Sequence, residues 1–257
     1  MSVNQGVFTP KQDLFKYLLP SGIPRNSLVI IAGEGGSGKS VIVAHLVKDA
    51  ILSEEPVVYV AIDDDPQTVL NQFNTFGVKT LEECNSKRLI IIDGFSYLMQ
   101  FKKPQPCVEE EIPLDSPGKL INSISRVVDK YKITDKGLVV VDSLNDIVML
   151  LDPTRVVEFI KSLRANFAKA RGVLTIATLH TSTSSFKEYL LSIEHLVDGV
   201  IETGSIPEEL AQHIPIFVRQ IIVRKMKGVD SKQGPVLYGI DREGLKPVIL
   251  KISGSTK

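Results

Sequence analysis

Short, almost uninterrupted apolar runs alternate along the chain with longer stretches in which apolar residues recur at helical spacing. Runs of Val, Ile and Leu of this kind are typical of strands that are buried on both faces. The predicted strands are Leu28–Ala32, Val57–Ile62, Leu89–Ile92, Leu138–Val141 and Val173–Ala177. The predicted helices are Ser40–Leu52, Gln67–Phe76, Lys119–Tyr131 and Arg155–Ala170. The alternation predicts an α/β fold with βαβ units and a mainly parallel sheet flanked by helices.

The pattern changes after Thr203. Three further runs are predicted as strands joined by short turns, in an antiparallel extension at the edge of the sheet: Ile216–Arg224, Val236–Ile240 and Pro247–Ile252. Because there is no internal repeat, we expect one domain over residues 1–257 with an N-terminal segment at 1–20.

Two segments lack this periodicity. The stretch 101–118 holds several prolines and the acidic run Glu109–Glu111, and is predicted to be a long, mobile surface loop. Residues 253–257 are predicted to be a polar tail.

Composition narrows the class of protein. With 257 residues, 43% of them hydrophobic, the chain can bury one α/β core and shows no sign of a second. The 30 basic and 30 acidic residues balance, so a nucleic acid or membrane partner would need a local patch. No apolar run approaches the roughly 18 residues of a membrane span, and no membrane partner is expected.

The cysteines and the first residues bear on the compartment. Cys84 and Cys107 lie far apart in the sequence and lack metal-ligand spacing, which favours a reducing, intracellular setting. The polar segment Met1–Pro10 lacks the apolar core of a signal peptide. We therefore expect a cytoplasmic protein.

One segment carries specific chemistry. It fits the phosphate-binding pattern G-x-x-x-x-G-K-[ST] and consists of Gly33, Glu34, Gly35, Gly36, Ser37, Gly38, Lys39 and Ser40. A predicted strand enters it and a predicted helix leaves it, so backbone amides and a helix N-terminus can surround a phosphate. Lys39 is predicted to reach the β- and γ-phosphates of ATP, and Ser40 to ligate Mg²⁺. A chance glycine-rich turn before a helix is the alternative.

A second half of the site is expected at the end of another strand. Asp142 follows Leu138–Val141 and is predicted to orient the magnesium ion, usually through water. Many strands end in Asp, so the prediction depends on its pairing with the glycine-rich segment. Asp93 also ends a predicted strand, but its position favours a turn cap.

Three carboxylates follow the second predicted strand. Asp65 is predicted to be the N-cap of a helix whose first residue is Pro66. Asp63 and Asp64 stand at the carboxyl end of the strand, where α/β sheets present ligands. One of them, with Asp64 slightly favoured, is a candidate for polarising the water that attacks the γ-phosphate. A solvated acidic turn is the alternative.

With these residues in place, the chain resembles the RecA superfamily and, within it, the KaiC-like ATPases and archaeal RadA paralogues. The resemblance runs from the Ser21–Arg25 phrase, Ser-Gly-Ile-Pro-Arg, to about Leu250. Relatives have a glycine where Asn26 stands here. The resemblance implies a RecA-like P-loop core with a C-terminal antiparallel extension, ATP and Mg²⁺ as cofactors, and ATPase activity.

The resemblance also implies roles for strand-end residues. The family usually has a Glu pair at the positions of Asp63 and Asp64, one of which is the catalytic base. Aspartate is one methylene shorter, so slow hydrolysis is expected. A polar residue near the end of the strand Val173–Ala177 senses the γ-phosphate in the family, and Thr178 or His180 matches it. A hydrogen-bonded strand-end histidine is the alternative for His180.

A basic phrase near the end, Arg224-Lys225-Met226-Lys227-Gly228, resembles the Lys-x-Arg-Gly of KaiC-like proteins. There the two basic side chains contact the γ-phosphate held by the neighbouring subunit, and Lys225 and Lys227 match them. A lysine at the second position lacks the bidentate fork of arginine. The resemblance implies a homo-oligomer, either a ring or a short filament. A solvated basic strand end is the alternative.

Binding of single-stranded DNA is left open by the sequence. The loop Thr181–Lys187, which binds DNA in RecA-like recombinases, is polar with one aromatic and one positive side chain, and could also cap a helix. The loop Asn145–Asp152 has no basic residue. From Ile216 to Lys257 nine basic residues face three acidic ones: Arg219, Arg224, Lys225, Lys227, Lys232, Arg242, Lys246, Lys251 and Lys257 against Asp230, Asp241 and Glu243. This patch could hold single strands or be a solvated edge sheet.

A strand-exchange recombinase is not expected. The chain before Ser21 is too short for the family's N-terminal DNA-binding domain, and it lacks the Phe-x-x-Ala polymerisation motif. Phe167-Ala168-Lys169-Ala170 has that spelling but lies inside a predicted helix, where Phe167 would be core. The expected function is a slow ATPase that modulates DNA recombination or repair through single-stranded DNA or a recombinase partner. The alternatives are a nucleotide-gated signalling module with protein partners, and an ATP-binding scaffold without turnover.

Overall fold

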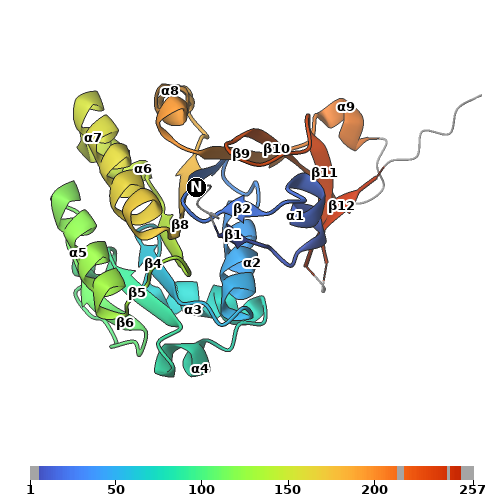
Figure 1. Ribbon diagram of the computed structural model, residues 1–257. Coiled ribbons are helices and arrows are strands. Elements are labelled where there is room, and N and C mark those ends of the chain that lie inside the picture. The colour runs from blue at the N-terminus through green and yellow to red at the C-terminus, as the bar shows by residue number, and fades with distance from the viewer. Residues whose placement is uncertain (1–5, 213–216, 242–243, 250–257) are drawn as a thin grey trace, which may run out of the picture.

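The computed structural model describes residues 6–212, 217–241 and 244–249. Their main feature is a ten-stranded sheet with the order β12-β11-β10-β9-β3-β8-β7-β4-β5-β6 (Figure 1). Its strands are β3 (Leu28–Gly33), β4 (Val57–Ala61), β5 (Leu89–Asp93), β6 (Val108–Glu111), β7 (Leu138–Asp142), β8 (Leu174–His180), β9 (Gly199–Ser205), β10 (Arg219–Met226), β11 (Val236–Asp241) and β12 (Gly244–Val248). A separate two-stranded sheet joins β1 (Val7–Phe8) to β2 (Ile23–Pro24).

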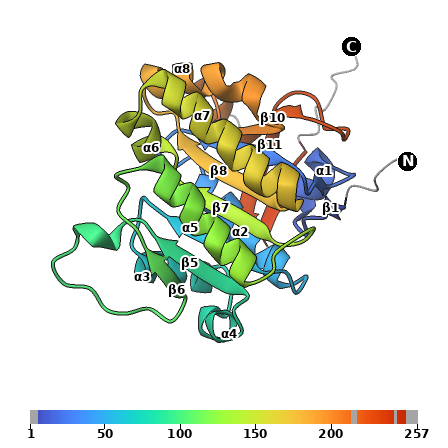
Figure 2. The same cartoon turned by 60° about the vertical axis from the view of Figure 1, so that its left-hand side comes forward.

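Helices cover both faces of the sheet. One core cluster packs it against α1 (Asp13–Leu18), α2 (Lys39–Ile51), α3 (Pro66–Thr75) and α4 (Thr80–Asn85). The other packs it against α5 (Pro117–Lys130), α6 (Asn145–Leu150), α7 (Pro153–Leu163) and α8 (Ser184–Ile193). Figure 2 shows α5 and α7 crossing the same face side by side. A further short helix, α9 (Glu208–Ala211), follows β9.

The predicted α/β fold is confirmed. The strands from β9 on one side to β6 on the other are parallel, and β10, β11 and β12 add the antiparallel extension. The predicted strand 247–252 is displaced to β12, and its last residues, like the predicted tail, lie outside the described residues. No described helix is long and apolar enough to cross a membrane.

The stretch 101–118 is not all loop, which corrects the prediction. Val108–Glu111 forms β6, which pairs in parallel with β5. Each glutamate of the run that suggested a solvated loop has a partner: Glu109 contacts Lys130 and Tyr131, Glu110 contacts Arg126 and Ser123, and Glu111 contacts Lys102. An edge strand tolerates such charges because its outer side chains reach neighbouring polar groups.

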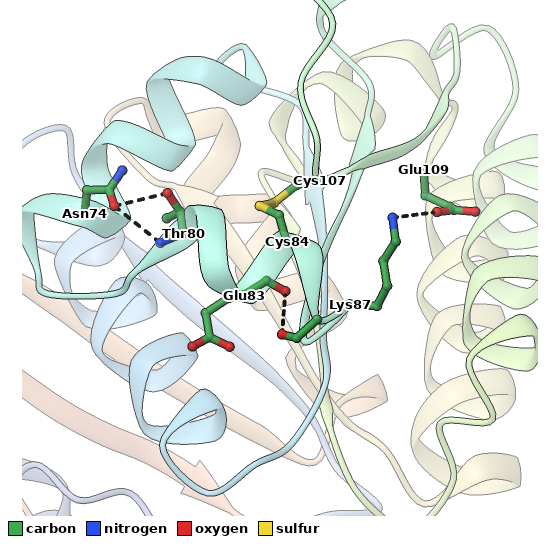
Figure 3. The surroundings of a disulfide bond; sticks show 8 residues. Asn74, Thr80, Glu83, Cys84, Lys87, Cys107 and Glu109 are labelled. Atoms are coloured by element: carbon green, nitrogen blue, oxygen red, sulfur yellow. Dashed lines mark hydrogen bonds and ion pairs between the residues drawn. A yellow bond between two sulfur atoms is a disulfide. The ribbon is translucent and has the colours of Figure 1, made fainter.

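The two cysteines form a disulfide, which removes the support for a reducing setting. Cys84 lies in α4 and Cys107 directly before β6, with their Cα atoms 4.7 Å apart (Figure 3). Both are buried. Because the bond spans 23 residues, the loop-entropy model gives a stabilisation of about 3 kcal/mol. The bond anchors the edge strand to the helix that precedes β5.

Local capping follows the predictions. The Asp65 side chain accepts hydrogen bonds from the amides of Gln67 and Thr68, with Pro66 as the first residue of α3. The Asp93 carboxylate accepts hydrogen bonds from the backbone amides of Phe95 and Ser96, as expected for a turn cap. Phe167 is buried in the core, in the π-helical turn that continues α7.

One buried histidine lies in the helix that follows the glycine-rich segment. His45 in α2 is 4% exposed, and neither ring nitrogen has a hydrogen-bond partner among the described residues. Its ring packs against Phe76 with centroids 5.3 Å apart. Burial, and to a lesser degree the charge of Lys48, lowers the pKa of His45 to about 4. The folded protein therefore holds this imidazole neutral.

This neutral histidine predicts a loss of stability in acid. The unfolded chain takes up a proton on His45 below pH 6.5, whereas the folded chain resists it down to about pH 4. Stability is thus fully present above pH 6.5, and about 3 kcal/mol is lost by pH 4. Urea unfolding of the parent and of His45→Leu between pH 7 and pH 4 checks this. The difference between the two should change by that amount, and a constant difference would contradict it.

Candidate functional site

The predicted site residues gather at one edge of the sheet. β4, β7, β8 and β3 are neighbouring parallel strands, with Ala61 opposite Asp142, Val141 opposite Ala177 and Gly33 opposite His180. Their carboxyl ends therefore point the same way. The structure brings together Lys39, Asp63, Asp142, Thr178 and His180 there.

The glycine-rich segment forms a tight curl between β3 and α2. Gly36 and Gly38 have φ of 73° and 98°, in the left-handed region that favours glycine. The Lys39 Nζ donates to the carbonyl oxygens of Gly33 and Glu34, each at 2.8 Å, and so spans the curl. The first amides of α2 have no acceptor within the helix, so this end can receive an anion.

β9 and the C-terminal extension hold the curl from behind. The carbonyl oxygen of Ser37 accepts hydrogen bonds from Thr203 Oγ1 at 2.9 Å and from the Tyr238 hydroxyl at 3.2 Å. The two hydroxyls are 2.7 Å apart, and both side chains are buried. A Cβ on Gly38 would lie 2.8 Å from the Tyr238 hydroxyl, and one on Gly33 would lie 2.2 Å from the Thr203 carbonyl oxygen. Sequence reasoning missed both residues, because nothing local marks a contact across so many residues.

The segment after β8 covers the front of the curl. The Gly35 amide donates to Ser182 Oγ at 3.0 Å, and Lys187 forms an ion pair with Glu34 at 3.1 Å. Thr183 caps α8 through the amide of Phe186. The loop that the sequence left open between DNA binding and capping therefore caps a helix and contacts the glycine-rich segment.

Asp142 is held by two hydroxyl groups. Thr178 donates to one carboxylate oxygen and Tyr59 to the other. Burial raises the pKa of Asp142, and these two hydrogen bonds oppose the rise. Thr178, a predicted γ-phosphate sensor, thus contacts the predicted magnesium ligand, and Tyr59 was missed in the sequence.

Asp63 is held more completely than Asp64. Its Oδ1 accepts from Ser143 Oγ at 2.7 Å and from the Ser143 amide at 3.2 Å, while Oδ2 lies 3.0 Å from His180 Nε2. Burial raises the pKa of Asp63, but the hydrogen bonds with His180 and Ser143 outweigh it, so the net shift is downward. Asp63 and Asp64 are both exposed, and the partial desolvation of Asp64, followed by the charges of Asp63 and Asp65, raises the pKa of Asp64.

Lys225 and Lys227 do not join this cluster. In the sheet, Lys225 lies opposite Val200 of β9, and Val200 lies opposite Ile30 of β3. Ile30 stands three residues before Gly33, the last residue of β3. At about 3.3 Å per residue, Lys225 therefore lies roughly 10 Å from the carboxyl edge of the sheet. Its Nζ donates to the Glu194 carbonyl oxygen at 2.7 Å, whereas Lys227 is exposed.

The donors present suit a magnesium nucleotide. Asp142 and Ser40 offer hard oxygen ligands, and Ser40 is exposed in the first turn of α2. Burial lowers the pKa of Lys39, while the charges of Asp142, Asp63 and Glu34 oppose that shift. The carboxylates of Asp142 and Asp63 would attract a cation, and the amides of the curl would attract an anion. The described residues include no cluster of His, Cys, Asp and Glu that could hold a metal by itself.

Comparison with known proteins also agrees with a nucleotide-binding site. The sequence pattern of the KaiC ATPase family matches residues 13–251. The chain is 24% identical to a UPF0273 protein of Sulfurisphaera tokodaii, over 88% of this chain and 76% of the relative. It is 24% identical to the circadian clock oscillator protein KaiC of Prochlorococcus marinus, over 90% of this chain but 44% of the relative.

A solved structure shares the fold. A KaiC-like protein from Pyrococcus horikoshii superposes with a TM-score of 0.71 at 19% identity, covering 95% of this chain and 99% of that one. At this identity the likeness concerns the fold alone.

The contact between the C-terminal extension and Ser37 leads to a prediction. Tyr238→Phe removes one buried hydrogen bond to the curl, which is worth about 1 kcal/mol. To the extent that the unbound curl then leaves its binding shape, MgATP must restore that shape on binding, so affinity should fall by up to roughly five-fold. Tyr189→Phe, on α8, is the matched control and should bind as the parent does. Calorimetric titration of the three proteins measures this, and equal affinity of Tyr238→Phe and the parent would show that the contact does not shape the curl.

Proposed function

The chain belongs to the KaiC ATPase family, and from that premise we propose that it binds MgATP at the Gly33–Ser40 curl and hydrolyses it slowly. The observation that supports this most directly is the meeting of Lys39, Asp142 and Asp63 at one sheet edge, beside the amino end of α2. A lysine, a half-buried strand-end carboxylate and a fixed second carboxylate are what phosphoryl transfer to water requires.

Each part of the site has a task in this proposal. The curl amides and Lys39 bind the β- and γ-phosphates. When the nucleotide binds, the Lys39 Nζ leaves the carbonyl oxygens of Gly33 and Glu34, which it contacts in this structure. Ser40 and Asp142 would hold Mg²⁺, and Thr178 and Tyr59 keep Asp142 oriented. When bound there, the ion would supply positive charge to offset the charge that develops on the phosphate oxygens.

Asp63 is the better candidate for the base. A water oxygen attacks the γ-phosphorus, its proton passes to the Asp63 carboxylate, and the bond to the β–γ bridging oxygen breaks, leaving ADP and phosphate. A base needs a fixed orientation and an ionised state. Asp63 has both, through Ser143 and His180. Its short side chain supports the expectation of slow turnover.

Loss of Lys39 tests the binding site. Lys39→Ala should weaken MgATP binding roughly ten- to a hundred-fold, because a charge-assisted contact is lost. Lys48→Ala, in the same helix, is the control and should leave affinity unchanged. Calorimetric titration with circular dichroism of each protein measures this. Normal affinity in a folded Lys39→Ala protein would place the nucleotide elsewhere.

The proposal includes a shared site between subunits. Lys225 and Lys227 lie away from the carboxyl edge of their own sheet, so they could meet a γ-phosphate only in a neighbouring chain. The backbone of Lys225 pairs with Val200 of β9, directly after a register shift at Arg224. A homo-oligomer, as a ring or short filament, would then be stabilised by ATP, because each nucleotide would bridge two chains.

Mixing of two inactive variants tests the sharing. Lys225→Ala should lower turnover and weaken ATP-promoted assembly. A mixture with Lys39→Ala should recover activity, since a mixed interface can pair an intact curl with an intact lysine. ATPase rate against mixing ratio, with subunit exchange confirmed by labelled chains, gives the answer. Rates that stay at the sum of the two variants despite exchange would exclude a shared site.

A second candidate function is binding of single-stranded DNA in recombination or repair, the setting in which RadA paralogues act. One observation favours it: Arg219 lies over the ring of Phe217 at 4.7 Å, and Phe217 is 79% exposed. An exposed aromatic beside a guanidinium is a stacking platform for bases. Other basic side chains of the patch are neutralised within the chain, since Arg224 pairs with Glu194 and Glu202, and Lys246 with Asp241.

Gel shifts distinguish DNA binding from a signalling role through protein partners. If the platform binds DNA, Phe217→Ala should weaken binding of a labelled oligothymidylate several-fold at low salt, consistent with loss of one stacked base. Leu191→Ala, also exposed, is the control. The same shifts with and without MgATP report whether the nucleotide gates the contact. No shift of the parent at low salt would leave the signalling module as the better reading.

A further inference from the structure

We propose that His180 is a positioning residue, whose imidazole Nε2 holds Asp63 in the orientation in which it activates the attacking water. The inference rests on the proposed hydrolysis. It differs from the role expected from the sequence, in which His180 reads the γ-phosphate directly.

The contact leaves Asp63 little freedom. Nε2 of His180 lies 3.0 Å from Oδ2, and Ser143 occupies Oδ1 from the other side at 2.7 Å. The two partners come from β8 and from the residue after β7, so neighbouring strand ends grip the carboxylate. Oδ1 already accepts two hydrogen bonds from Ser143, so Oδ2 is the oxygen that keeps a lone pair able to accept a proton from water. About a third of both side chains remains exposed, so water can reach them.

His180 is itself fixed by its backbone. The side-chain amide of Asn145 donates to the His180 carbonyl oxygen at 3.0 Å and accepts from the His180 amide at 2.8 Å. Asn145 is 8% exposed and contacts Ser143 as well. On its other side, β8 pairs His180 with Gly33 of β3. The backbone of His180 is therefore fixed on both sides, which limits the positions that its imidazole can take, as a positioning role requires.

The same contacts argue against phosphate sensing. A donor that reads the γ-phosphate must present an N–H or O–H to it. In this structure Nε2 lies against Asp63 and the Thr178 hydroxyl donates to Asp142, so each would first have to leave a carboxylate, whereas Lys39 leaves only neutral carbonyls. If Nε2 carries the proton, it donates to the carboxylate and the base stays ionised. The acidic turn supplies a reason for such a clamp, because Asp64 and Asp65 stand beside Asp63 and would otherwise repel it.

Two substitutions of different chemistry test the proposal on the full chain with MgATP. The nitrogen Nε2 is four bonds from Cα in both histidine and glutamine, so His180→Gln can keep the donor. His180→Ala cannot. We expect His180→Ala to lower kcat at least ten-fold with KM within two-fold of the parent, and His180→Gln to keep a third or more of kcat. The exposed His195→Ala is the control.

A double-mutant cycle separates positioning from a general structural effect. On the Asp63→Asn background, His180→Ala should lower kcat no further, because the group that it positions is gone. Additive losses, or weakened ATP affinity with ADP affinity unchanged, would overturn the proposal in favour of phosphate sensing. Parent-like kcat in His180→Ala would overturn it too.

The failures of the two proposals can be told apart. If Asp63→Asn abolishes turnover while His180→Ala does not change it, only the positioning role is wrong. If the parent binds MgATP but releases no phosphate, the hydrolytic function is wrong and the positioning role with it.

Discussion

The register of four parallel strands is the constraint on which the site depends. One row of residues crosses β4, β7, β8 and β3: Ala61, Asp142, Thr178 and Ile31. Ala61 pairs with Asp142, and Thr178 pairs with Ile31. The pairing of Val141 with Ala177, one residue earlier, places Asp142 beside Thr178. Two residues further along, on the same face, stand Asp63, His180 and Gly33. Because side chains alternate between faces, a slip of one residue would send a carboxylate to the opposite face. The apolar cores on both faces oppose such a slip.

A phosphate-binding curl must turn its amides outward, and this creates a second requirement. The carbonyl groups on the inner side need donors, because a buried carbonyl without one costs free energy. Here the backbone amides of Thr181 and Ser37 donate to the carbonyl oxygens of Gly33 and Glu34, and the hydroxyls of Thr203 and Tyr238 donate to that of Ser37. The antiparallel extension is thus more than an edge of the sheet. Its Tyr238, together with Thr203 of the parallel strand β9, supplies the hydroxyl groups that hold the curl from behind, which explains why the site needs strands that follow it by more than 160 residues.

The sequence predicted those parts of the fold that burial on both faces makes visible. The five apolar runs became β3, β4, β5, β7 and β8; four of them begin at the predicted residue, and their last residues are shifted by one to three. β6 was missed because its glutamates suggested solvent, whereas they pair with α5 and the adjoining loop. β9 was missed because its apolar core is only Val200 and Ile201. The disulfide and the Tyr59 and Tyr238 contacts could not be predicted, since they depend on distances that only the folded chain defines.

The same limit applies to strand-end residues, and it bears on mechanism. A sequence can place Thr178 and His180 at the right edge, but it cannot say whether a hydroxyl or an imidazole faces a ligand or a neighbouring carboxylate. In the folded chain both face carboxylates. Two acids so close to Lys39 would repel a bare nucleotide, which brings several negative charges, whereas MgATP carries a cation that the acids attract. The clamps on Asp63 and Asp142 therefore suit a site in which nucleotide and metal arrive together.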